Sequence, residues 1–413
     1  MRRRLASFLL LSVLAAGCGR SASDPTDPTP TPTPGPQGDE AIFEAMLAGE
    51  TPAAEGIAAV AASDGWPIAT DTDYVFVRAN DGQGPYSLAG DHDAWVGAPM
   101  ALVNGFWWIR VEIASPVGSL YKFVDGLDVF AADPRSRRYG YDALGEYSLV
   151  DASAAHLQRF FAVTDGVVTP RTVRVRVPAG TATHHLYVHD GQNLFDPNAI
   201  FGGWKLDETL GASTLAIGID NTSARMDEYT PVPDDIGSGA IGGDGNVYAD
   251  FVHGHVRPMI ESRFGAPDRV GTMGSSLGGL IAFHLVLRHP GYDFAASLSG
   301  TMGWGSINSA VNNQTMIEAA VAAGHGSTTL YLDSGGDDGA GNLCLDSDSD
   351  GVNDDTADSS DNYCENRQLA DALPAEGYTF AVDLFHWHEP NAAHNEAAWA
   401  ARVFRPLGIF EAL

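Results

Sequence analysis

The stretch that decides the fold is Gly274-Ser275-Ser276-Leu277-Gly278-Gly279. It fits the pattern G-x-S-x-G, which places a serine on a tight strand-to-helix turn with its hydroxyl clear of the sheet. Residues 269–273 before it favour a short buried strand, and the apolar run 280–287 after it favours a buried helix that ends before Pro290. The context predicts Ser276 as a candidate nucleophile, and an ordinary glycine-rich turn is the alternative.

Further apolar runs predict the architecture around this turn. Helical stretches, notably 247–264 and 280–288, lie between the runs. Strands that alternate with helices imply a mostly parallel sheet covered on both faces, with the site at the carboxyl ends of the strands. The predicted strands are residues 157–163, 172–177, 185–189, 215–219, 270–273, 294–298, 329–332 and 380–385.

Two loops carry the partners that a serine nucleophile needs. A serine hydroxyl is activated by a base within hydrogen-bond reach, which a carboxylate orients. The strand predicted at 329–332 is followed by Asp333-Ser334-Gly335-Gly336-Asp337-Asp338, and the last strand by a loop with His386, His388 and His394. Nucleophile, acid and base therefore occur in the order Ser, Asp, His.

Several motifs in this half resemble the esterase D-like branch of the α/β-hydrolases, which includes enterochelin, feruloyl and acetylxylan esterases. The resemblance covers residues 165–410 and predicts an α/β-hydrolase fold. It implies Asp338 as the triad acid, with Asp337 second, and His394 as the base because it opens the pattern H-x-x-x-x-W. The motifs are His189-Asp190-Gly191-Gln192-Asn193-Leu194-Phe195, Ile219-Asp220-Asn221, Arg225 with Glu228-Tyr229-Thr230-Pro231, Gly274 to Gly279, and His394-Asn395-Glu396-Ala397-Ala398-Trp399.

The tetrahedral intermediate of ester hydrolysis also needs two preorganised donors for its oxyanion. We expect the backbone amides of Leu277, directly after the nucleophile, and of Gln192, in the loop after the third strand. Arg225 and Trp304 are candidates for the substrate cleft. A structural ion pair is the alternative for Arg225, and core packing is the alternative for Trp304.

The N-terminus predicts export. Three arginines at 2–4 precede the apolar run 5–16, which is too short to span a bilayer as a mature helix. Residues 14–18 resemble a bacterial lipobox, which implies lipid attachment at Cys18 and a lipoprotein at the outer membrane or cell surface. Secretion without a lipid is the alternative. We expect a signal peptide at 1–18 and a Pro/Thr-rich linker at 19–40.

Residues 41–150 differ in pattern from the remainder. Short helices are expected at 42–47 and 56–62, followed by short alternating strands that predict a small all-β sandwich. Leu88 to Trp95, Gly105-Phe106-Trp107 and Tyr121 to Gly126 resemble the immunoglobulin-like module found ahead of α-amylase-superfamily domains. The resemblance implies either glycan binding through surface tryptophans or a spacer. The esterase-like domain is expected at 151–413.

An acidic insertion at 344–364 separates the predicted acid from the predicted base. Asp346, Asp348 and Asp350 precede Gly351, an arrangement typical of calcium loops, and the run resembles thrombospondin type 3 repeats, in which later aspartates such as Asp354 and Asp358 complete the shell. A structural Ca²⁺ is therefore expected, with a solvated acidic loop as the alternative. In an exported chain, Cys344 and Cys364 predict a disulfide.

The net charge of the protein limits the classes of partner that it is expected to bind. The net charge is −30, with 53 acidic and 23 basic residues, so nucleic-acid binding is not expected. The combined expectation is an exported serine esterase acting on a small-molecule or glycan ester, such as an acetyl or feruloyl ester, with no cofactor needed for the chemistry and membrane contact only through the lipid anchor. A siderophore esterase and a non-catalytic Ca²⁺-dependent glycan-binding surface protein are the alternatives.

Overall fold

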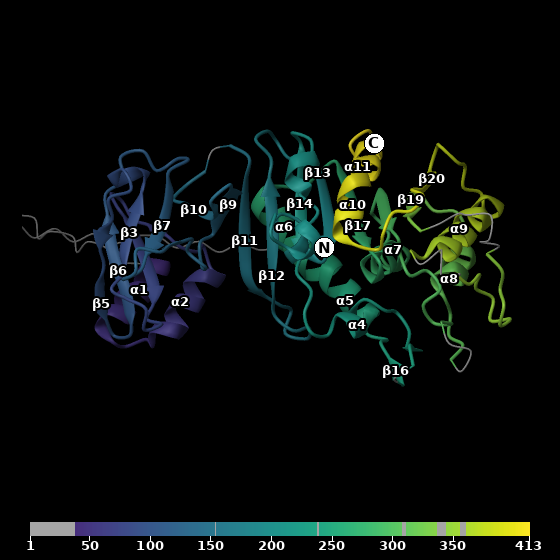
Figure 1. The fold of residues 1–413 in the computed structure, drawn as a ribbon, viewed down its shortest axis with the longest axis horizontal. Coiled ribbons are helices and arrows are strands. Elements are labelled where there is room, and N and C mark those ends of the chain that lie inside the picture. The colour runs from purple at the N-terminus through teal and green to yellow at the C-terminus, as the bar shows by residue number, and fades with distance from the viewer. Residues whose placement is uncertain (1–37, 153, 238, 308–310, 337–343, 356–360) are drawn as a thin grey trace, which may run out of the picture. The chain divides into compact units, whose positions relative to one another are not determined.

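The computed structural model describes residues 38–152, 154–237, 239–307, 311–336, 344–355 and 361–413 (Figure 1). The predicted signal segment with Cys18, the carboxylates of Asp337 and Asp338, and Asp358 of the acidic insertion lie outside these residues. Within the described ranges, none of the helices has the length and apolar character needed to cross a membrane.

A mixed, mostly parallel sheet forms the centre of the C-terminal half, as the sequence predicts. Its strand order is β20-β19-β18-β17-β13-β14-β12-β11. The six strands from β14 to β20 run parallel, whereas β12 is antiparallel to both β14 and β11. The strands are β11 (His156–Val163), β12 (Arg171–Val177), β13 (His184–His189), β14 (Thr214–Ile219), β17 (Arg269–Ser275), β18 (Phe294–Leu298), β19 (Thr329–Ser334) and β20 (Leu384–His388).

The last strand begins later than predicted. The sequence predicted residues 380–385, but Thr379 to Asp383 form a turn in which the Thr379 amide donates to Asp383 Oδ1 at 2.7 Å. The amide of Leu384 donates back to the Thr379 carbonyl at 3.2 Å, so the strand starts only after this turn. As a result, His386 and His388 lie on β20 and not in the loop that follows it.

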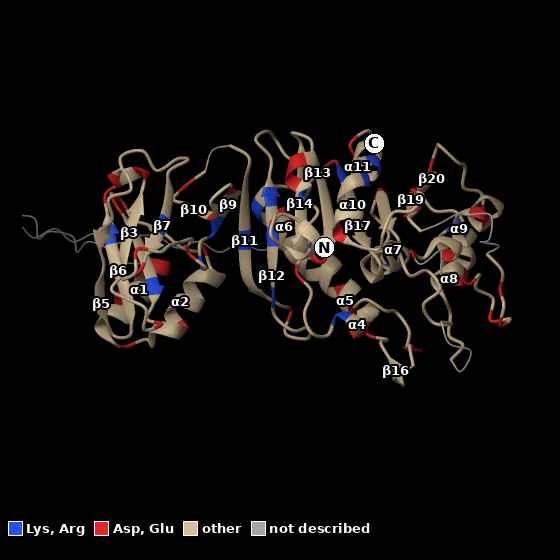
Figure 2. Cartoon of the chain, in the orientation of Figure 1, with Lys and Arg blue, Asp and Glu red and all other residues tan. Residues whose placement is uncertain are grey.

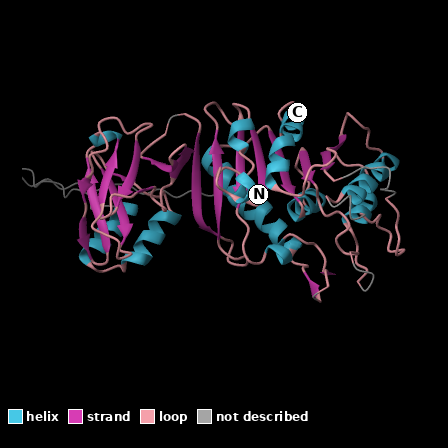
Figure 3. Cartoon of the chain, viewed as in Figure 1, coloured by secondary structure: helices cyan, strands magenta, loops and turns pink. Residues whose placement is uncertain are grey.

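Helices cover both faces of the sheet (Figure 3). Along β13, Leu186 and Val188 pack on one face and Tyr187 packs on the other, as the two-residue period of a strand requires. Leu186 and Val188 share a core with α3 (Leu206–Thr209), α10 (Glu396–Arg402) and α11 (Phe404–Phe410). Tyr187 shares the larger core with α5 (Gly245–Phe251), the π-helical turn Val252–Val256, α6 (Arg257–Phe264), α7 (Leu277–Arg288), α8 (Met316–Ala323) and α9 (Tyr363–Ala372).

Residues 68–149 form two sheets that enclose a separate core. Phe76 and Tyr121, from opposite sheets, meet edge to face with ring centroids 4.8 Å apart. The second sheet continues into the central one, because β9 pairs with β11. One sheet has β1 (Ile68–Ala69), β2 (Tyr74–Ala79), β5 (Ala101–Val103) and β6 (Phe106–Val111); the other has β3 (Ser87–Gly90), β4 (Ala98–Pro99), β7 (Leu120–Val124), β8 (Phe130–Ala131), β9 (Arg138–Asp142) and β10 (Gly145–Leu149).

Adjacent Trp107 and Trp108 on β6 face opposite sides. Trp107 lies between the two sheets against Tyr86, with ring centroids 6.0 Å apart. Trp108 packs outside them against Phe43 at 5.4 Å, beneath the two predicted lead-in helices, α1 (Asp39–Ala48) and α2 (Ala53–Ala62). Both tryptophans are therefore packed against other aromatic side chains.

Acidic residues are spread over the described chain (Figure 2), and several arginines form ion pairs with them. Arg171 on β12 forms an ion pair with Glu228 of α4 (Arg225–Glu228), and Arg174 pairs with Asp220. Each such pair cancels one acidic and one basic charge, so the net charge of −30 is unchanged by the pairing.

Candidate active site

The turn between β17 and α7 places Ser276 at the carboxyl edge of the sheet. Ser276 has φ 54° and ψ −127°, a strained conformation for a non-glycine residue and the one expected of a nucleophile elbow. A Cβ on Gly274 would lie 2.4 Å from the carbonyl of Gly278, so this tight turn requires glycine. The Ser276 amide donates to the Leu298 carbonyl at 3.0 Å, which fixes the elbow against the end of β18.

His394 is the histidine that contacts a buried carboxylate. Its Nδ1 lies 2.7 Å from Oδ1 of Asp361, and the Asp361 side chain is 1% exposed. The other two candidates are held differently: burial lowers the pKa of His386 to about 4, and His388 Nε2 contacts the carbonyl of Gly336 at 3.2 Å. Of the three histidines, His394 is thus the one that the structure places against a carboxylate, and its role as base stays a prediction.

The carboxylate beside His394 belongs to Asp361, which lies within the acidic insertion predicted at 344–364. Asp361 precedes Asn362, the N-cap residue of α9, and is connected to the elbow through Ser299. The Ser299 hydroxyl contacts Asp361 Oδ2 at 2.7 Å, and Ser299 directly follows Leu298, the partner of the Ser276 amide. Asp338, the predicted acid, lies outside the described residues.

A fixed loop carries the second predicted oxyanion donor. Asp190 precedes Gln192 and adopts a left-handed conformation with φ 61°. Its carboxylate accepts two hydrogen bonds from Arg225, at 2.8 and 2.9 Å, and one from Asn221 at 2.6 Å. Asp190 Oδ2 is also the nearest atom, at 3.3 Å, to a Cβ built on Gly278, so this loop lies against the start of α7. The amides of Gln192 and Leu277 therefore belong to neighbouring segments.

Two predicted substrate residues have structural partners. Arg225 donates to Asp190 from Nε and Nη2 on one edge of its guanidinium, which matches the ion-pair alternative. Trp304 is 2% exposed, donates from Nε1 to the Val232 carbonyl at 2.8 Å and belongs to the larger core. It also lines a cavity of about 570 Å³ with Leu280 and His284.

Burial perturbs the carboxylates around this edge. Asp333, at the end of β19, is 0% exposed, and burial raises its pKa to about 6 although Arg402 pairs with it at 3.0 Å. Burial likewise raises the pKa of Asp355 to about 6 and raises that of Glu365 well above its usual range. Negative charge is therefore costly here unless a cation or a donor compensates it.

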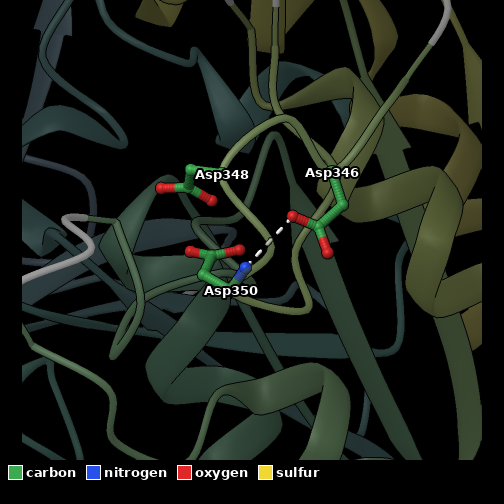
Figure 4. A group of neighbouring side chains, drawn as sticks. All are labelled: Asp346, Asp348 and Asp350. Carbon is green, nitrogen blue, oxygen red and sulfur yellow. Dashed lines mark hydrogen bonds between the residues drawn. The ribbon is translucent and has the colours of Figure 1, made fainter.

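The acidic insertion is fixed at its base by the predicted disulfide, because Cys344 and Cys364 are bonded. Oxygen atoms of Asp346, Asp348 and Asp350 all lie within 4.8 Å of one another (Figure 4). Asp354 is turned toward Ser347, whose amide donates to its Oδ2 at 2.8 Å, and Asp358 lies outside the described residues. Calcium binding by this group stays a prediction.

Several known proteins are similar to parts of this chain. YbbA, an uncharacterized protein of Bacillus subtilis (strain 168), is 31% identical over 123 residues, or 28% of this chain and 49% of that protein. The chain thus spans about half the length of this curated relative. Among solved structures, an IroE-like serine hydrolase from Shewanella oneidensis has a TM-score of 0.47 at 19% identity, over 62% of this chain and 80% of that chain.

Two further structures show similar weak likeness. The enterobactin esterase FES from Shigella flexneri has a TM-score of 0.43 at 14% identity, over 83% of this chain and 94% of that chain. The siderophore hydrolase EstA from Aspergillus nidulans has a TM-score of 0.44 at 19% identity, over 61% of this chain and 94% of that chain.

The family model described as "Putative esterase" matches residues 166–408, which is more than half of the chain. The matched range includes the elbow, Asp361 and His394. The chain belongs to this esterase family.

Proposed function

We propose that the protein is a serine carboxylic-ester hydrolase with Ser276 as nucleophile, His394 as general base and Asp361 as the acid that orients it. The observation that carries this proposal is the 2.7 Å contact between His394 Nδ1 and the buried carboxylate of Asp361, at the sheet edge that holds the Ser276 elbow. With Nδ1 held by a carboxylate, the imidazole carries its proton there and leaves Nε2 free of a proton as the base.

The reaction proceeds in two stages. Ser276 Oγ attacks the ester carbonyl while His394 Nε2 takes the hydroxyl proton and then delivers it to the leaving alcohol. Water attacks the acyl-enzyme with the same histidine as base. The amides of Leu277 and Gln192 stabilise the oxyanion in both stages, and one such donor is worth about 3 to 4 kcal/mol in related chemistry.

Hydrolysis of p-nitrophenyl acetate and butyrate tests the proposal. We expect Ser276→Ala to abolish burst and turnover, whereas Ser275→Ala, a matched change at the preceding buried serine, keeps the activity. Ester hydrolysis that survives Ser276→Ala would remove Ser276 as the nucleophile.

For the substrate, we propose acetyl or feruloyl esters on glycans, released outside the cytoplasm by a lipid-anchored enzyme. The net charge of −30 and the buried carboxylates near Asp361 support a neutral ester over a polyanionic ferric siderophore, because like charges disfavour association. Comparing kcat/KM for acetylated xylo-oligosaccharides with that for a ferric catecholate siderophore ester decides between the two.

A further inference from the structure

The carboxylate of Asp361 is shared between His394 and a second set of buried groups. Whereas Oδ1 faces His394, Oδ2 contacts the Ser299 hydroxyl at 2.7 Å and the amide of Gly335. Nη2 of Arg402 lies 3.4 Å from the same Oδ2. Arg402 is 1% exposed, so this contact lies away from solvent.

The hydrogen on Ser299 has one direction open to it. Ser299 Oγ contacts three groups: Trp399 Nε1 at 3.0 Å, Arg402 Nη2 at 2.6 Å and Asp361 Oδ2. Indole and guanidinium nitrogens are donors only, so both donate to the serine oxygen. The single hydroxyl proton of Ser299 must therefore point to Asp361 Oδ2. Ser299 thus accepts a hydrogen bond from Arg402 and donates one to the Asp361 carboxylate, so it links the two groups.

Arg402 also balances a second buried charge. Its Nε donates to Oδ1 of Asp333 at 3.0 Å, and the Tyr331 hydroxyl donates to Oδ2 of Asp333 at 3.0 Å. One guanidinium thus lies between two buried carboxylates, of which only Asp361 contacts the histidine. A planar guanidinium is suited to bridging such a pair because its donors have fixed directions.

We propose that Arg402, acting through Ser299, is a positioning residue that fixes the orientation of the Asp361 carboxylate beside His394. Its positive charge also reduces the negative electrostatic potential of the buried carboxylates at His394. This inference rests on the proposed serine mechanism. The cation opposes protonation of the imidazole, whereas Asp333 favours it. Other titratable groups close to these carboxylates or to His394 are Asp355, Tyr331 and Glu396, and Glu396 is itself close to Asp190 and Arg225.

The proposal predicts shifts of opposite sign in the acidic limb of the pH profile of kcat/KM. In Arg402→Gln the loss of the cation moves the acidic limb to higher pH by about one pH unit. In Asp333→Asn the loss of the anion moves the limb to lower pH by a similar amount. Arg402→Lys keeps the charge, so the limb stays in place while kcat falls about tenfold because the fork geometry is lost. Ser299→Ala lowers kcat about tenfold at unchanged KM.

The measurement uses the full chain with p-nitrophenyl acetate from about pH 5 to about pH 9, a range that spans the usual titration of histidine. Arg367→Gln, which removes an exposed arginine of α9, is the charge control and leaves the limb unmoved. If Arg402→Gln does not fold, Asp333→Asn carries the limb test, with Arg402→Lys as the variant whose limb stays in place. An acidic limb that stays in place in Arg402→Gln and Asp333→Asn, or that moves in the same direction in both, overturns the proposal. Persistent activity in Ser276→Ala would instead refute the serine mechanism itself.

Discussion

Replacing Asp361 with asparagine tests the proposed triad more sharply than removing the side chain. Three donors surround Oδ2: the Ser299 hydroxyl, the Gly335 amide and Nη2 of Arg402. The amide oxygen of the new asparagine must take that side, which turns its NH₂ group toward His394. Nδ1 of His394 then has to accept a hydrogen bond, so the ring proton moves to Nε2 and the base is blocked.

The expected loss follows from this tautomer change. The equivalent Asp→Asn change in a serine protease triad lowers kcat about 10⁴-fold. That factor corresponds to about 5.5 kcal/mol of transition-state stabilisation, since each tenfold step is about 1.36 kcal/mol. The fold should tolerate the change, because Arg402 keeps its ion pair with Asp333 and the amide keeps the size of the carboxylate.

Steady-state hydrolysis of p-nitrophenyl acetate by Asp361→Asn and by Asp338→Asn provides the comparison. We expect a kcat loss of about 10⁴-fold in the first, with KM nearly unchanged, and less than about tenfold in the second. Circular dichroism and thermal unfolding confirm that both variants fold. A large loss in Asp338→Asn together with an active Asp361→Asn would refute the assignment of Asp361 and restore the sequence-based one.

Three further predictions concern the acidic insertion. Replacing Cys344 and Cys364 with serine should lower the free energy of unfolding by about 3 kcal/mol in urea titrations, and an unchanged midpoint would argue against a stabilising bridge. Burial raises the pKa of folded Asp355 to about 6, so its favourable contribution is complete below its unfolded pKa and is lost as the pH rises through about 6. In chelator, Asp355→Asn should therefore gain melting temperature relative to wild type between about pH 5 and about pH 8, and a loss with rising pH would contradict this. Calorimetric titration should show Ca²⁺ uptake that Asp348→Asn weakens; equal uptake by both proteins would remove Asp348 as a ligand.

The sheet could be predicted because its strands are buried on both faces and so appear as continuous apolar runs. The runs at 215–219 and 294–298 match β14 and β18 within one residue. The predicted start of β20 was too early in the sequence, because the apolar residues Phe380 and Val382 lie in a turn that the Asp383 side chain closes. A local side-chain hydrogen bond overrode the hydrophobic pattern there.

Helix α8 was missed although its signal is present. Thr315 and Glu318 form a reciprocal capping box, with the Glu318 amide donating to Thr315 Oγ1 at 3.2 Å and the Thr315 amide to Glu318 Oε2 at 2.9 Å. The pattern T-x-x-E before an apolar run is a recognised helix start. Because α8 is short, Met316–Ala323, its apolar pattern was not recognised as a helix among the surrounding loop residues.

Asp361, the proposed triad acid, could not be chosen from sequence order alone, because it is separated from β19 by the whole acidic insertion. It reaches His394 only because the chain folds back, and the bond between Cys344 and Cys364 closes that excursion. The cysteine pair was the usable signal, since it implies that the residues near Cys364 return to the start of the insertion. Because Asp337 and Asp338 come soon after the strand in the sequence, they were chosen as the acid instead of Asp361.

Labelling with a fluorophosphonate, followed by intact mass and peptide mapping, tests the central claim most directly. The account predicts a single adduct on Ser276, absent from Ser276→Ala and formed at least about 10³-fold more slowly in His394→Ala, because the histidine activates the serine. An active ester hydrolase that carries its adduct on another residue, or that is not labelled at all, would contradict the account.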